Sequence, residues 1–393
     1  MSQLINLTIR LPQANGGSIN YRLHEPASFA LSSVAPRSRV AYAAAHIVCD
    51  PLVTTSHLSP ARLDWEATLA YRRYLWSCGL AVAEAMDTAQ RGMGLDWPLA
   101  SELIQRSLAE ARTVPGARIA CGAGTDQLIP SNSVTLDDIE AAYAEQCELI
   151  EQHGGQIILM ASRALAACAR TLDDYLRVYD TILRQVKQPV ILHWLGEVFD
   201  PALRGYWGSE DLDEAMQTCL EVIRQHQDKI DGIKISLLDR ERELAMRQHL
   251  PAGIRMYTGD DFNYLEMLRA DEQGHYSHAL LGIFDAIAPA AAVALRALNE
   301  GDMKRYENIL APTVALARHI FQQPTVYYKT GIVFMAYLNG HQSHFRLVGG
   351  LENARSVLHL ADIFMLADLA GLLRRPEMAV ARMRAVLAIV GYA

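Results

Sequence analysis

Residues 231–236 read Asp-Gly-Ile-Lys-Ile-Ser, a short apolar stretch in which Lys234 stands between Ile233 and Ile235. β-Branched residues in a run of this length are typical of a buried strand. Successive side chains of a strand point to opposite faces, so Lys234 faces away from both isoleucines. In a closed barrel, one of these two faces is the interior.

Seven further apolar runs share this character and are separated by helical patterns. The runs lie at 39–48, 79–85, 118–124, 155–161, 189–195, 254–259 and 278–284. Between them, residues 63–77 and 136–153 carry apolar residues at helical spacing, and Thr135 with Asp138 resembles a capping box. Eight repeats of strand and helix predict a (β/α)8 TIM barrel of the α/β class.

The chain extends beyond the barrel at both ends. We expect residues 1–37 to form an N-terminal hairpin, turning at Asn15-Gly16-Gly17 and covering one end of the main domain. The barrel is expected over 38–300. A C-terminal helical extension packed on the barrel is expected over 301–393. The final helices are predicted at 289–300, 302–322, 327–339, 351–374 and 376–391.

Composition narrows the class of protein. Hydrophobic residues make up 51% and charged residues 20%, as in soluble enzymes. A net charge of −8 argues against nucleic acid as a partner, because phosphate binding needs a basic surface. The six cysteines contain no CxxC pair, and the N-terminus does not resemble a secretion signal. We expect a cytoplasmic protein with reduced cysteines and no membrane partner, because the longest apolar runs are too short to span a bilayer.

The strand ends supply candidate catalytic groups, because barrel enzymes place their active sites there. An inward Lys234 would be desolvated, which lowers its pKa and leaves a nucleophilic amine. The alternative is a lysine that reaches solvent or pairs with a carboxylate. His193, at the end of the fifth strand, is a candidate proton relay, although a purely structural role is about as plausible from the sequence.

Glycine-containing strand ends offer places to hold a substrate. Backbone amides in the turn 121–127, which includes Gly124 and Thr125, or at Gly259 are expected to bind an acid group. Asp260 is assigned to substrate binding, with helix capping as its alternative. Arg163 could bind an anionic group through its guanidinium fork or lie solvated in a loop.

Several segments in register resemble the dihydrodipicolinate synthase and N-acetylneuraminate lyase superfamily. They are the middle region 118–195, the lysine strand 231–236, MYTGDDFNYLEML, the eighth-strand region LLGIFDAIAPAAAVALRALNEGDMKRYENILAP, and PTVYYKTGIVFMAYLNG. The resemblance implies that Lys234 is the Schiff-base lysine, that no cofactor is needed, and that the chain forms a homodimer or homotetramer. It also places Leu281 in the substrate-binding set.

Departures from the family pattern indicate a divergent branch. The family's relay tyrosine is replaced by His193. Its paired threonines are replaced by Ala85-Met86-Asp87-Thr88, in which only Thr88 offers a hydroxyl to a substrate and Asp87 would repel a carboxylate. The segment 199–215 is an insertion foreign to the family.

Together these features predict a class I, Schiff-base aldolase, lyase or dehydratase acting on a small oxo acid or sugar-derived carbonyl compound. One alternative is a divalent-metal-dependent aldolase or isomerase. It would draw on His46, Asp50, His193, Glu197, Asp260 and His278. Another is a catalytically inactive barrel that binds a ligand.

Overall fold

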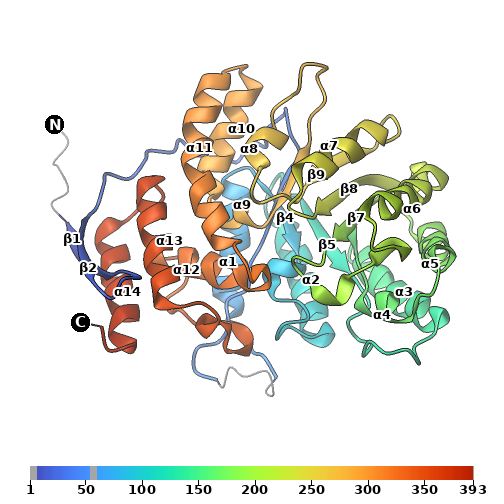
Figure 1. Cartoon of the computed structure of the whole chain (residues 1–393), viewed down its shortest axis with the longest axis horizontal. Coiled ribbons are helices and arrows are strands. Elements are labelled where there is room, and N and C mark those ends of the chain that lie inside the picture. The colour runs from blue at the N-terminus through green and yellow to red at the C-terminus, as the bar shows by residue number, and fades with distance from the viewer. Residues whose placement is uncertain (1–6, 54–59, 393) are drawn as a thin grey trace.

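A closed barrel of eight parallel strands forms the centre of the computed structural model, which describes residues 7–53 and 60–392 (Figure 1). Each strand pairs with its neighbours in chain order, and β10 closes the barrel against β3. The strands are β3 (Ala41–Ala44), β4 (Ala81–Glu84), β5 (Ile119–Ala123), β6 (Gln156–Met160), β7 (Val190–Leu195), β8 (Ile230–Ser236), β9 (Arg255–Thr258) and β10 (His278–Leu281). The predicted TIM barrel is confirmed.

The strand register separates an interior from an exterior face. Tyr257 and Met160 belong to a small apolar cluster that fills the barrel interior. Lys234 aligns with Tyr257 on one side and His193 on the other, and His193 aligns with Met160. Aligned residues of neighbouring strands point to the same face, so Lys234 and His193 are directed into the barrel.

Helices surround the barrel and continue beyond its last strand (Figure 1). Between the strands lie α1 (Trp65–Ser77), α2 (Trp97–Ala111), α3 (Leu136–Gln152), α4 (Arg163–Cys168), α5 (Leu172–Gln185), α6 (Leu212–Gln225), α7 (Arg240–His249) and α8 (Tyr264–Met267). After β10 follow α9 (Ile283–Ala286), α10 (Ala288–Asn299), α11 (Met303–Ile320), α12 (Tyr328–Leu338), α13 (Val357–Leu369) and α14 (Pro376–Ile389). The capping box of Thr135 and Asp138 starts α3, as predicted. No helix among the described residues combines the length and apolar character needed to cross a membrane.

The N-terminal hairpin packs in a different place from the one we expected. Strands β1 (Thr8–Pro12) and β2 (Ser18–Arg22) pair antiparallel, and β1 contacts α13 and α14 rather than covering an end of the barrel (Figure 1). Tyr21 donates a 2.7 Å hydrogen bond to buried Asp368 on α13. The first six residues of the segment 1–37, over which the hairpin was predicted, lie outside the described residues.

One predicted C-terminal helix is shorter than expected. The pattern at 351–374 yields α13 only over Val357–Leu369, preceded by a 3-10 turn at Val348–Asn353. Ser356 caps the helix by accepting a hydrogen bond from the amide of His359, and Gly371 ends the region with a φ of +68°.

Candidate active site

A cavity of about 220 Å³ opens at the carboxyl ends of the barrel strands. Four of the predicted site residues line it: Gly124, Thr125, Arg163 and His193. Asp87, in the 3-10 turn Asp87–Ala89 after β4, lines it as well. This is the end of the barrel at which such folds place their chemistry.

Lys234 lies on β8, is 5% exposed, and is aligned with His193, which lines the cavity. In the described part of the chain, its ammonium group takes part in no hydrogen bond or ion pair. Burial lowers the pKa of Lys234, an effect that Asp87 and Asp261 partly oppose. The lysine is therefore closer to its neutral, nucleophilic form than an exposed lysine would be.

His193 is the neighbour of Lys234 on β7. Its Nε2 lies 3.1 Å from the hydroxyl of Ser236, whereas its buried Nδ1 has no hydrogen-bond partner among the described residues. Burial and the charge of Lys234 lower the pKa of His193 to about 3, while Asp87 acts in the opposite direction. The imidazole is therefore neutral at physiological pH and still has one ring nitrogen available to a ligand.

Two carboxylates act on Lys234, and their own environments differ. Burial opposes ionisation of Asp87, but His193, Lys234, Lys329 and Arg163 together lower its pKa. Asp261, which follows β9, has its pKa raised to about 7 by burial. Asp87 is thus ionised near neutral pH, whereas Asp261 exchanges a proton there.

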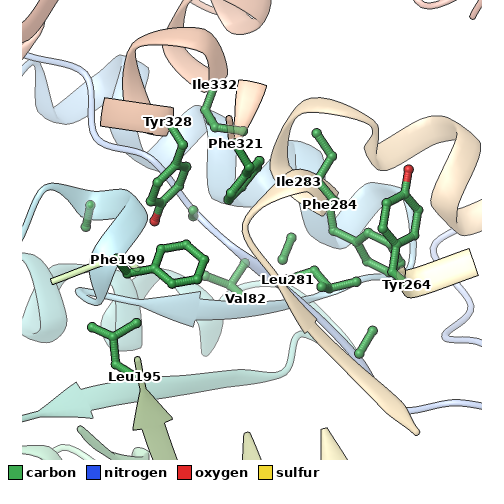
Figure 2. Packing of buried hydrophobic residues seen from close by; sticks show 14 of the residues in the cluster. Val82, Leu195, Phe199, Tyr264, Leu281, Ile283, Phe284, Phe321, Tyr328 and Ile332 are labelled. Atoms are coloured by element: carbon green, nitrogen blue, oxygen red, sulfur yellow. The ribbon is translucent and has the colours of Figure 1, made fainter. Parts of the chain in front are cut away.

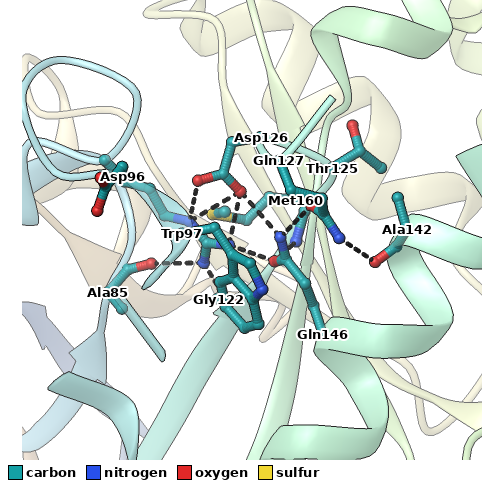
Figure 3. Close-up of polar contacts among 12 residues, drawn as sticks. Ala85, Asp96, Trp97, Gly122, Thr125, Asp126, Gln127, Ala142, Gln146 and Met160 are labelled. Carbon is teal, nitrogen blue, oxygen red and sulfur yellow. Dashed lines mark hydrogen bonds and ion pairs between the residues drawn. The ribbon is translucent and has the colours of Figure 1, made fainter. Parts of the chain in front are cut away.

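The turn that carries Asp87 is fastened to the next strand by Arg91. Its guanidinium donates to the carbonyl oxygens of Ala85 and Gly122 and forms an ion pair with Asp126, with a shortest distance of 2.7 Å. Gln146 joins the same network (Figure 3). Ala85 has a φ of +50°, an uncommon conformation for a residue with a Cβ, so this network holds a strained turn.

Arg163 is anchored by the insertion 199–215. Its Nε donates to the carboxylate of Asp200, and its Nη1 lies so close to Gly92 that a Cβ there would clash. Thr125 and Ser162 lie nearby on the cavity wall, with their hydroxyl oxygens 2.5 Å apart.

The C-terminal extension contributes two residues from the first turn of α12. The Tyr328 hydroxyl lies 3.0 Å from that of Thr88, which places a predicted site residue in a hydrogen bond. The Tyr328 ring stacks on Phe321 at 4.4 Å and meets Phe199 edge-on (Figure 2). Lys329 follows and is 5% exposed. Burial lowers the pKa of Lys329 to about 8, with Asp87 opposing this effect.

Two backbone amides that we expected to hold an acid group are already used within the protein. The Gly124 amide already donates to Gln146 at 2.6 Å, and the Gly259 amide donates to the Ile235 carbonyl at 2.8 Å. Neither amide is therefore free to hold an acid group.

Asp260 and Leu281 also occupy other roles. Asp260 caps the following turn by accepting from the amides of Phe262 and Asn263, the alternative weighed from the sequence. The Leu281 side chain is fully buried in the outer core with Ile283 and Phe284 (Figure 2), because its neighbour Leu280 takes the interior position. Neither side chain lines the cavity.

The residues invoked for a metal site do not come together. Within 7–53 and 60–392, no three His, Cys, Asp or Glu side chains are grouped so that they could hold a metal ion. His46 instead pairs with Asp285 at 2.9 Å. His278 lies at the first residue of β10, away from the carboxyl ends of the strands, and its Nδ1 accepts a hydrogen bond from the Val40 amide. The metal-dependent alternative therefore has no geometric support among these residues.

Sequence reasoning missed the contributions of Lys329, Tyr328 and Asp200, treated Asp87 only as an obstacle, and left Asp261 open between capping the next helix and orienting a catalytic group. A signal existed for Lys329, because it is the one charged residue in the apolar stretch Tyr328–Leu338. Lysine is almost never fully buried without a specific partner or function. The neighbours of the others come from distant segments of the chain, which no local pattern reveals.

Solved structures with the same fold belong to the dihydrodipicolinate synthase group. Dihydrodipicolinate synthase from Aquifex aeolicus is 13% identical, with a TM-score of 0.61 over 90% of this chain and 98% of that chain. YagE of E. coli K12, a prophage protein of the dihydrodipicolinic acid synthase family in complex with pyruvate, is 13% identical, with a TM-score of 0.63 over 90% and 99%. The Acinetobacter baumannii enzyme complexed with pyruvate is 16% identical, with a TM-score of 0.59 over 85% and 99%.

These similarities confirm the predicted resemblance at the level of the fold. No curated protein sequence matches this chain. A family model does match, over residues 9–392, and the chain belongs to that family, described as "Protein of unknown function (DUF993)".

Proposed function

We propose that this protein is a class I lyase, an aldolase or dehydratase, that forms a Schiff base between Lys234 and a small carbonyl compound. The observation that carries the proposal is a buried, unpaired lysine in the barrel interior, beside a cavity at the carboxyl ends of the strands. Desolvation of that lysine favours the neutral amine that nucleophilic attack requires.

In the proposed reaction, the Lys234 nitrogen attacks the carbonyl carbon, and the carbonyl oxygen becomes a hydroxyl group. Loss of that oxygen as water leaves an iminium, which accepts the electron pair released when a neighbouring C–C or C–H bond breaks. The resulting enamine takes up a proton at carbon to become an iminium again, and addition of water to that iminium returns the free amine and the carbonyl product.

Protons must move to and from the nitrogen and oxygen during these steps. Asp261 is our candidate for this exchange, because its pKa of about 7 suits a group that both accepts and donates protons near neutral pH. With a pKa of about 3, His193 is too weakly basic for the relay role we first gave it. We assign to its neutral imidazole a hydrogen bond to the substrate instead, and to ionised Asp87 the stabilisation of the iminium.

The test is reductive trapping. The purified protein is incubated with pyruvate and with a panel of sugar-derived oxo acids and ketones, borohydride is added, and adducts are located by intact mass and peptide mapping. We expect an adduct on Lys234 that is absent from the Lys234→Ala variant and retained in Lys304→Ala, where an exposed lysine is removed.

Mapping distinguishes the two buried lysines of the site. An adduct on Lys329 instead of Lys234, or near-normal turnover by Lys234→Ala, would contradict the proposal. Binding of a carbonyl compound without any adduct in a folded sample would support the inactive ligand-binding barrel.

A further inference from the structure

The ammonium group of Lys329 is buried without an acceptor suited to its charge. Its Nζ contacts the thioether sulfur of Met93 at 3.4 Å and lies 5.6 Å from the centre of the Tyr328 ring. Among the described residues it has no ion pair within 4.0 Å. A thioether is a weak acceptor, and a buried charge is costly unless it is paired.

Arg163 approaches the same turn, at Gly92 and Met93. Its guanidinium lies against Gly92, while the Lys329 ammonium lies against Met93, the next residue. Asp200 takes only the Nε of Arg163, and neither terminal nitrogen is hydrogen-bonded within the described part of the chain. Two cationic groups with unused donors therefore flank one short turn.

The remaining charges leave this region positive. Lys234, Lys329 and Arg163 act on Asp87, and Asp200 acts on Lys329, so the positive groups exceed these two carboxylates by one once Lys234 carries the charge of the iminium and Lys329 is protonated. Asp261, whose pKa is about 7, acts on Lys234, whereas Lys329 is influenced by Asp87, Arg163 and Asp200. A bound anion would supply the missing charge at the end where Lys329 lies.

A neutral donor is available on the same wall. The hydroxyls of Thr125 and Ser162 share one hydrogen bond, and Ser162 also accepts from the Leu165 amide. Two hydroxyl hydrogens serve one mutual bond, so one remains to donate to a ligand in the cavity.

The charge of Asp87 does not distinguish the two ends of the site, because it acts on Lys329 and Arg163 as well as on Lys234. The unused donors distinguish them. With Lys234 committed to the carbonyl carbon, the terminal nitrogens of Arg163 and the ammonium group of Lys329 remain to hold a charged group of the substrate.

From this arrangement we propose that Lys329, together with Arg163, binds an oxyanion group of the substrate at a distance from the carbonyl carbon. The substrate class is thus a carbonyl compound that carries a distal carboxylate or phosphate. This inference rests on the proposed Schiff-base function, because Lys234 defines where the carbonyl carbon lies.

The test compares matched pairs of carbonyl compounds in the borohydride trapping assay. Pyruvate is paired with 2-oxoglutarate, which adds a distal carboxylate, and dihydroxyacetone with dihydroxyacetone phosphate. For the unaltered protein, either 2-oxoglutarate or dihydroxyacetone phosphate should show a half-saturation concentration about tenfold or more below that of its partner compound. This is the magnitude expected for a hydrogen bond to a charged group. The preferred pair tells a carboxylate site from a phosphate site.

The Lys329→Met variant, which keeps the side-chain length and removes the charge, should reduce this ratio by about tenfold. Lys304→Met removes an exposed lysine and should leave the ratio unchanged. An unchanged ratio in folded Lys329→Met overturns the assignment of Lys329.

If Lys329→Met fails to fold, the unaltered protein still provides the test, because ratios near one for both pairs overturn the oxyanion site. Absence of any adduct, with every compound of the panel, would instead refute the Schiff-base function itself. The two failures are therefore distinguishable.

Discussion

Replacing Gly259 with alanine would place a methyl group against the lysine strand. The new Cβ would lie 2.3 Å from the Ser236 hydroxyl, 2.4 Å from the Ile235 carbonyl oxygen and 2.9 Å from Cε of Lys234. The carbonyl cannot withdraw freely, because it accepts the 2.8 Å hydrogen bond from the Gly259 amide that joins the strands. The side chain of Lys234 must therefore move as well.

Two magnitudes follow from these contacts. Overpacking of this kind costs about 1–3 kcal/mol of unfolding free energy. The Lys234 Cε atom must retreat about 0.5 Å to reach an ordinary 3.4 Å contact, and the Ile235 oxygen about 1 Å. Misplacement of reacting groups by about 1 Å can cost about 100-fold in rate, so we expect a loss of trapping that approaches this value.

The assay combines urea unfolding with the rate of adduct formation on Lys234. Gly124→Ala is the stability control, because its Cβ would come closest to the flexible end of Met160, at 3.2 Å, and would meet Asp126 and Gln146 at ordinary contact distances of 3.6 and 4.0 Å. Equal stability and an unchanged trapping rate in Gly259→Ala would refute the close-packing argument.

Three further perturbations test other parts of the structure. Burial raises the pKa of Glu243 from 4.5 to about 7, so the folded protein binds this proton more tightly than the unfolded chain, and stability falls as pH rises through that window. The free energies of unfolding of wild type and Glu243→Gln, measured with urea, should differ by about 3 kcal/mol more at one end of this pH window than at the other. Parallel pH profiles of the two proteins would contradict the raised pKa of Glu243. Arg72 forms a bidentate, fully buried ion pair with Glu84. Arg72→Met should therefore lower the free energy of unfolding by about 3–5 kcal/mol, and the additional change Glu84→Leu should restore much of that loss. An Arg72→Met variant as stable as wild type would refute this. The His193 ring, with a pKa of about 3, should show no NMR titration between pH 5 and 9, and a midpoint near 6.5 would exclude the buried neutral state.

The sequence by itself determined the barrel and placed Lys234 on the opposite face of its strand from both neighbouring isoleucines, whereas the register in the structure decided that this face is the interior. Hydrophobic periodicity is local, so eight apolar runs separated by helical patterns were readable without any long-range information. Alternation along β8 placed Lys234 opposite Ile233 and Ile235, which lie in the outer core. The capping box of Thr135 and Asp138 was readable for the same reason, since both partners lie within one helical turn.

Only the tertiary structure decided which groups surround that lysine. Thr88 meets Tyr328 across 240 positions of sequence, and Arg163 meets Asp200 through an insertion that looked foreign to the fold. Whether the Gly259 amide was free depended on a partner in another strand. Packing, burial and charge arise from segments far apart in the chain, so a local pattern singles out Lys234 as a candidate nucleophile but does not reveal its electrostatic environment.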